Sequence, residues 1–209
     1  MTDTPPTDAP STDTPPTGTP TPDAPPTEAP TPGAPARRAT SLVLVNTGDG
    51  KGKSTAAFGT MLRAVARGWP VAVVQFLKSG SWHAGEEDIG RRLGVDWWAL
   101  GDGFTWDSES MEETQAVALE AWRFARETIA AGAHRMVILD EITYPINWGW
   151  IEGDEVVAAI AGRPADVNVI VTGRDAPKAL IDIADTVTEM RKVRHAFDRG
   201  ILAKKGVDY

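Results

Sequence analysis

Residues 42–55 read LVLVNTGDGKGKST, and this stretch decides the fold. Its apolar start is typical of a buried strand, and the loop that follows has glycine at every second position. The loop ends in Lys53 and Ser54, where a helical pattern begins. Glycines let a loop turn its backbone N–H groups toward a phosphate, and the next helix adds its positive N-terminal end. The stretch therefore predicts a strand, a phosphate-binding loop and a helix.

The loop departs from the usual spacing of such sites. The pattern G-x-x-x-x-G-K-[ST] requires glycine at position 47, where this chain has Thr47. A chance glycine-rich turn would explain the glycines, but not Lys-Ser at this offset between a strand and a helix. We expect Lys53 to reach the outer phosphates and the Ser54 hydroxyl to bind Mg²⁺. The predicted nucleotide-binding residues of the loop are Gly48, Asp49, Gly50, Lys51, Gly52, Lys53, Ser54 and Thr55.

Composition divides the chain in two. Residues 1–36 hold 12 of the 16 prolines and five acidic residues, with no Lys or Arg. Such a stretch cannot bury enough apolar surface to offset the entropy of ordering it. We therefore predict a disordered Pro/Thr-rich tail at 1–36, with a solvating role favoured over a docking role, and a folded domain at 37–209.

The remainder of the chain excludes several classes of function. It carries 24 acidic and 21 basic residues, a balance that argues against nucleic-acid binding, which needs a clustered basic face. The chain has no cysteine, and its histidines lack metal-ligand spacing, so we expect no disulfide and no zinc site. No apolar run approaches the roughly 18 residues of a membrane span, and the N-terminal residues lack the basic-then-apolar pattern of a signal peptide. A cytoplasmic protein without a membrane partner is expected.

Short apolar runs alternate with helical patterns from Arg37 onward. Strands are expected at 41–46, 71–76, 95–100, 136–140, 167–172 and 186–190, and helices at 54–67, 84–93, 108–131, 155–161 and 177–184. This order predicts an α/β fold of the P-loop NTPase-like (RecA-like) kind, with a mostly parallel sheet and helices on both faces. Ligands of such sheets bind at the carboxyl ends of the strands, where Gln75, Glu141 and Gly173 fall.

Two further segments carry candidate chemistry. The strand at 136–140 ends in Asp140 and is followed by Glu141, and acids at this place hold the Mg²⁺ water shell in phosphate-loop proteins. Glu141 could instead polarise a water for hydrolysis, and both roles stay open. The loop GDGFTW at 101–106 presents Phe104 and Trp106, which suit a large planar second substrate rather than a hydrolase. Core packing is expected for Trp69, Trp97, Trp98 and Trp122.

Taken together, the segments TGDGKGKSTAAFGT, VVQFLKSG, GDGFTW, VILDEITY, VTGRDAP and HAFDRGILAKKGVDY resemble a known family. Over about residues 40–209 the chain is similar to the bacterial ATP:corrinoid adenosyltransferases, which act on cob(I)alamin and cob(I)yrinic acid a,c-diamide. The resemblance implies transfer of the 5′-deoxyadenosyl group of ATP to Co(I), with release of tripolyphosphate. It also implies Mg²⁺ or Mn²⁺, a flavoprotein reductant and a homodimer.

The resemblance assigns roles to individual residues. Lys53 would neutralise the leaving triphosphate, and Glu141 with Asp140 and Ser54 would hold the metal. Phe104 and Trp106 match aromatic residues that exclude the lower axial ligand of cobalt, which brings the Co(II)/Co(I) potential within reach of a flavoprotein. Arg63 and Arg174 would contact the nucleotide.

Two other functions fit the phosphate loop. A P-loop ATPase or small-molecule kinase would use Glu141 to activate water or a substrate hydroxyl, and would yield ADP. A carrier of corrinoid or nucleotide would bind without turnover, so that Lys53 and Glu141 would be dispensable for catalysis.

Overall fold

Six parallel strands form the centre of the domain, which a computed structural model describes over residues 38–77, 85–99 and 111–208. The strands are β1 (Val43–Thr47), β2 (Val71–Gln75), β3 (Asp96–Ala99), β4 (Met136–Asp140), β5 (Asn168–Thr172) and β6 (Thr186–Glu189). Their order across the sheet is β3-β2-β4-β5-β1-β6, and each neighbouring pair is parallel. The predicted α/β architecture is therefore confirmed.

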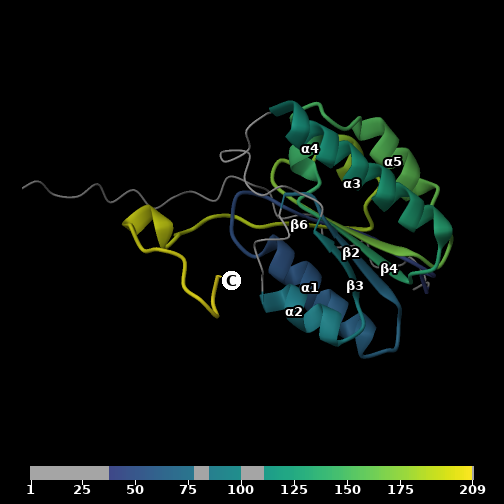
Figure 1. The fold of residues 1–209 in the computed structure, drawn as a ribbon, viewed down its shortest axis with the longest axis horizontal. Helices are drawn as coiled ribbons and strands as arrows, with labels where there is room; N and C mark the ends of the chain where they lie inside the picture. Colours follow the sequence, from purple (N-terminus) through teal and green to yellow (C-terminus); the bar gives the residue numbers. More distant parts are fainter. Residues whose placement is uncertain (1–37, 78–84, 100–110, 209) are drawn as a thin grey trace, which may run out of the picture. The chain divides into compact units, whose positions relative to one another are not determined.

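Helices cover both faces of this sheet (Figure 1). They are α1 (Lys53–Val65), α2 (Gly85–Arg92), α3 (Met111–Ala131), α4 (Thr143–Asn147), α5 (Gly153–Ala161) and α6 (Lys178–Asp182), followed by a 3₁₀ turn, η1 (Phe197–Arg199). In Figure 1, α1 and α2 lie on one face, and α3, α4 and α5 lie on the other. The domain thus has three layers, as expected for a parallel sheet.

Burial on both faces explains the apolar runs of the central strands. All five residues of β2, β4 and β5 are buried. Alternate side chains pack under α1, in a cluster with Phe58 and Met61, and against α3 and α5, in a cluster with Trp122 and Ile160. Fixed layers on both sides hold the strand ends, and hence the side chains at those ends, in place.

The sequence patterns located the elements to within a few residues. The bounds of β4 were predicted correctly, whereas α1 ends at Val65, two residues before the expected end. Two short elements were missed, α4 and η1. α4 contains Pro145, which breaks a helical pattern in a sequence but is tolerated in the first turn of a helix. The expected start of α3 at 108 lies outside the described residues.

The described residues from Arg38 onward form one compact unit. Within the described ranges, no helix is both long enough and apolar enough to span a bilayer. The division of the chain at residues 36 and 37 stays a prediction.

Candidate nucleotide-binding site

The glycine-rich loop joins the end of β1 to the start of α1, against the segment that follows β6. A Cβ on Gly48 would lie 2.5 Å from the carbonyl oxygen of Met190, and one on Gly50 would lie 2.6 Å from the same atom. The Gly50 N–H donates a hydrogen bond to that oxygen at 2.6 Å. Gly48 has φ +91° and Gly52 has φ +115°, which side chains rarely adopt. Close backbone contact and positive φ therefore explain the glycines.

Thr47 stands where the usual pattern has glycine, and the structure gives it a function in the fold. Its Oγ1 accepts a hydrogen bond of 3.1 Å from the N–H of Ala176. Ala176 lies in the loop after β5, which also carries Arg174. Thr47 thus ties the phosphate loop to a second loop at the same edge of the sheet.

The first turn of α1 is open to an anion. In the described part of the chain, no side chain caps this helix at Gly52, and its first turn contains no acidic residue. The first N–H groups of a helix lack intrahelical partners and carry its positive partial charge. Lys53, Ser54 and Thr55 begin this helix, so their backbone amides suit phosphate oxygens.

Lys53 folds back over the loop, where its Nζ donates a hydrogen bond of 2.8 Å to the carbonyl oxygen of Gly50. Partial burial lowers the pKa of Lys53, and the positive charge of Arg174 lowers it further. The negative charges of Glu141, Asp49 and Asp140 act in the opposite direction. An ammonium that has lost hydration beside another cation favours an anionic partner, which a phosphate supplies.

Asp140 is fully buried at the end of β4, and neutral donors contact both of its carboxylate oxygens. Gln75 Nε2 donates to Oδ2 at 2.8 Å, and Thr172 Oγ1 donates to Oδ1 at 2.7 Å. These two bonds fix the direction of the carboxylate. They also offset part of the cost of burying it.

Glu141 follows in the left-handed region, with φ +66°. This conformation costs a non-glycine residue about 1–2 kcal/mol, and such strain gathers at functional sites. Its N–H donates to Thr172 Oγ1 at 3.0 Å. The Glu141 charge raises the pKa of both Lys53 and Tyr144, although burial is the larger cause for Tyr144. The Glu141 carboxylate is therefore close enough to Lys53 for its negative charge to stabilise the ammonium.

The available oxygens fit a hard cation. Ser54 supplies a hydroxyl, and Asp140 and Glu141 supply carboxylates. Among the described residues, no group of three or more His, Cys, Asp or Glu is placed to hold a metal. Mg²⁺ is usually bound by one or two carboxylates together with substrate phosphates rather than by a protein cage. This donor set suits a cation that arrives with a nucleotide.

Some of the predicted site residues lie close to one another in the structure, and others lie further apart. Asp49, Asp140, Glu141 and Arg174 lie close enough to Lys53 to shift its pKa. Lys51 forms an ion pair with Asp208 near the end of the chain.

Arg63, by contrast, lies in the last turn of α1. At 1.5 Å per residue this places it about 15 Å along the helix from Lys53. Phe104 and Trp106 lie outside the described residues. The roles of these three residues stay predictions.

Sequence patterns missed three contributors. Thr172 and Met190 were not singled out, and Gln75 was placed at the ligand edge without a role. The signal for two of them was present, because β2 and β5 read VAVVQ and NVIVT, apolar runs that end in a polar residue as β4 does. Met190 acts through its backbone oxygen, which side-chain chemistry does not reveal.

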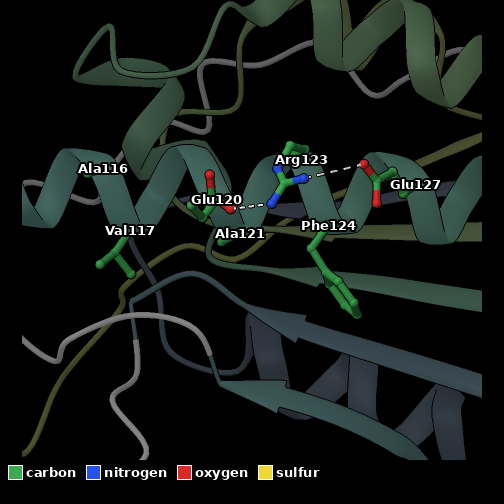
Figure 2. A pocket seen from close by; sticks show the side chains of 7 residues that line it. All are labelled: Ala116, Val117, Glu120, Ala121, Arg123, Phe124 and Glu127. Carbon is green, nitrogen blue, oxygen red and sulfur yellow. Dashed lines mark hydrogen bonds and ion pairs between the residues drawn. The ribbon is translucent and has the colours of Figure 1, made fainter.

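A separate hollow of about 430 Å³ lies along α3 (Figure 2). Its apolar lining comes from Ala116, Val117, Ala121 and Phe124. Figure 2 shows Arg123 bridging Glu120 and Glu127, at 2.5 and 3.9 Å. α3 covers the sheet face opposite α1 (Figure 1), so this hollow is no part of the nucleotide site.

A phosphate loop between a parallel strand and a helix, with a strand that ends in an acid two places away in the same sheet, defines a phosphate-loop nucleotide-binding protein. Comparison with known proteins narrows this class. The chain belongs to the ATP:corrinoid adenosyltransferase family, because residues 39–209 match the family described as ATP:corrinoid adenosyltransferase BtuR/CobO/CobP.

Curated relatives agree with this assignment. A corrinoid adenosyltransferase of Escherichia coli K12 is 43% identical over 174 residues, covering 83% of this chain and 88% of the relative. The corrinoid adenosyltransferase CobA of Salmonella typhimurium is 42% identical with the same coverage, and one from Pseudomonas aeruginosa is 44% identical over 83% of this chain and 86% of its own. A solved structure titled DNA replication initiation factor, at TM-score 0.32 and 10% identity, covers 72% of this chain and 40% of its own, too weak a likeness to support the fold.

Proposed function

We propose that this protein transfers the 5′-deoxyadenosyl group of ATP to the Co(I) centre of a corrinoid and releases tripolyphosphate, in the biosynthesis or salvage of adenosylcobalamin. The observation that carries this proposal is the family match over residues 39–209, in which the phosphate loop lies. In this reaction a cobalt–carbon bond forms with the electron pair of Co(I). The bond between the ribose 5′ carbon and the triphosphate oxygen breaks, and the oxygen keeps its pair.

The residues of the loop suit this chemistry. The leaving group is a whole triphosphate, so charge builds up on phosphate oxygens, and Lys53 and the first amides of α1 would neutralise it. Co(I) is itself a strong nucleophile, and the reaction requires no proton transfer from the attacking atom. The protein therefore has to position the two substrates in line and stabilise the leaving charge.

Ser54, Asp140 and Glu141 are the residues that would hold Mg²⁺. A cation at this place would draw charge from the triphosphate oxygens. Arg174, whose charge reaches Lys53, would contact the same phosphates. Arg63 would contact the nucleotide from further along α1.

Further proposals rest on the resemblance to the family. Phe104 and Trp106 would occupy the lower face of the corrin and keep out an axial ligand, so that a flavoprotein can reduce Co(II) to Co(I). The acceptor would be cob(I)alamin or cob(I)yrinic acid a,c-diamide. The enzyme would act in the cytoplasm as a homodimer, and residues 1–36 would form a solvating tail.

Product analysis tests the proposal. The protein is incubated without oxygen with ATP, Mg²⁺ and chemically reduced cobalamin. We expect a product with a light-sensitive cobalt–carbon absorbance, together with tripolyphosphate in equal amount. ADP and orthophosphate without an alkylated corrinoid would instead identify an ATPase or a kinase, and binding without turnover would identify a carrier.

A further inference from the structure

A row of polar side chains crosses the sheet on the face covered by α1. Gln75, Asp140 and Thr172 are the last residues of β2, β4 and β5, three strands that lie side by side. The residue two positions earlier on each strand belongs to the apolar cluster under α1. Because side chains two apart on a strand point to the same face, the polar row also lies on the α1 side, next to the phosphate loop.

The hydrogen bonds of this row converge on Asp140 from the strands on either side of it. The indole Nε1–H of Trp97, on β3, donates to Gln75 Oε1 at 2.8 Å. An indole nitrogen only donates, so this bond turns the amide oxygen toward Trp97 and the amide NH₂ toward Asp140. Gln75 Nε2 then donates to Asp140 at 2.8 Å. The three side chains are at most 2% exposed, so water does not compete with either bond.

Packing holds the start of this chain of hydrogen bonds in place. The ring of Trp97 lies 5.0 Å from that of Phe58 on α1, centroid to centroid. Gly90 of α2 also lies against this ring, and a Cβ added there would lie 2.8 Å from the indole. A larger residue at position 90 would displace the ring. The donor that orients Gln75 is therefore fixed by both helices on this face.

Thr172 has two partners through a single hydroxyl group. Its Oγ1 donates to Asp140 Oδ1 at 2.7 Å and accepts from the N–H of Glu141 at 3.0 Å. The same atom thus orients the buried carboxylate and holds the residue whose backbone is strained, with φ +66°. Valine has the same shape and can make neither bond, whereas serine can make both.

We propose that Gln75 and Thr172 are positioning residues of the nucleotide site: they fix the Asp140 carboxylate and the Glu141 main chain, and thereby set the affinity for the Mg²⁺ that accompanies ATP. The inference rests on the proposed Mg²⁺–ATP site. Partners that hydrogen-bond a metal-binding carboxylate orient it, and their loss weakens metal binding about 10–100-fold. Neither residue needs to contact ATP or the corrinoid for this effect.

The test measures binding rather than turnover. Titration calorimetry gives the Kd of ATP with and without Mg²⁺. The Kd without Mg²⁺ divided by the Kd with Mg²⁺ is the ratio that reports the gain in affinity due to the metal. We expect Thr172→Val and Gln75→Met to lower this ratio at least about tenfold. The Kd without Mg²⁺ should stay unchanged, because Lys53 and the loop are intact. Thr172→Ser should restore the wild-type ratio.

A matched control is Thr128→Val, which removes a hydroxyl hydrogen bond of 2.9 Å to the Phe124 carbonyl on α3, on the other face of the sheet. It should keep the wild-type ratio. Thermal melts identify any variant that does not fold. If Thr172→Val does not fold, the proposal is tested by comparing Gln75→Met with the wild type.

Three results would overturn the proposal. They are a wild-type ratio in the folded variants, an equal loss in Thr172→Ser and Thr172→Val, and an ATP affinity of the wild type that does not depend on Mg²⁺. Adenosyl transfer is not measured. A wild type that binds Mg²⁺ and ATP in this way but makes no alkylated corrinoid would refute the proposed function and leave the positioning role intact.

Discussion

The Nζ of Lys53 donates a hydrogen bond to the carbonyl oxygen of Gly50, three residues earlier in the same loop. The ammonium group that we expect to bind a triphosphate is therefore hydrogen-bonded to a neutral carbonyl oxygen in this structure. Nucleotide binding would exchange this bond for a contact with an anion. Hydrogen bonds to charged groups contribute about 1.5–3 kcal/mol, so we expect Lys53→Met to weaken ATP binding about 10–150-fold. Arg67→Gln, which removes an exposed cation beyond the other end of α1, should leave the Kd near that of the wild type.

The lowered pKa of Lys53 predicts a proton linked to binding. In the window between this pKa and the ordinary value of 10.5, the free folded protein binds fewer protons at Lys53 than the unfolded chain does. Stability should therefore rise with pH across that window. ATP phosphates favour the charged ammonium, so binding there should take up a proton, and affinity should fall as pH increases. Calorimetry in two buffers of different ionisation enthalpy measures the uptake; an equal uptake in Lys53→Met would assign it to another group.

Two glycines close together in the sequence should respond to alanine in opposite ways. A Cβ at Gly50 would lie 2.6 Å from the Met190 carbonyl oxygen, so Gly50→Ala must shift the loop or the segment after β6. We expect a loss of stability of about 1–3 kcal/mol and much weaker ATP binding. Gly59, inside α1, is the control, since among the described residues nothing lies within 4 Å of an added Cβ. Gly59→Ala should stabilise the protein by about 0.5–1 kcal/mol, measured by urea unfolding.

Two substitutions at Glu141 separate the cost of its strained backbone from the chemical role of its carboxylate. Glycine adopts φ +66° without strain, whereas alanine does not. Glu141→Gly should therefore be more stable than Glu141→Ala by about 1 kcal/mol in urea unfolding. Both variants should lose adenosyl transfer, because both lack the carboxylate. Transfer at the wild-type rate in either variant would show that the Glu141 carboxylate has no part in the reaction.

The aromatic pair outside the described residues can be tested through the oxidation state of the substrate. We expect the double variant Phe104→Ala, Trp106→Ala to bind ATP normally but to lose activity when cob(II)alamin is supplied with a flavin reductant. With cob(I)alamin prepared chemically, the same variant should stay active, which is the internal control. Full activity with cob(II)alamin and the flavin would refute the assigned role.

Local sequence predicted the parts of this site that are made by single strands and loops. The strand MVILD, the acids at its end and the loop that begins α1 could be read directly, because apolar runs and glycine spacing carry that information. The contact between Gly50 and Met190 could not, because it joins residues 140 positions apart through backbone atoms. Pairing of Gln75 with Asp140 needed the strand order, which places β2 beside β4.

Sheet order also dictates when this site can form during protein synthesis. β1, which leads into the phosphate loop, lies between β5 and β6, which are the last two strands in chain order among the described residues. A nascent chain therefore exposes its glycine loop long before Met190 leaves the ribosome to brace it. A ribosome stalled before β6 therefore holds a chain that contains the nucleotide motif but lacks the support for its loop.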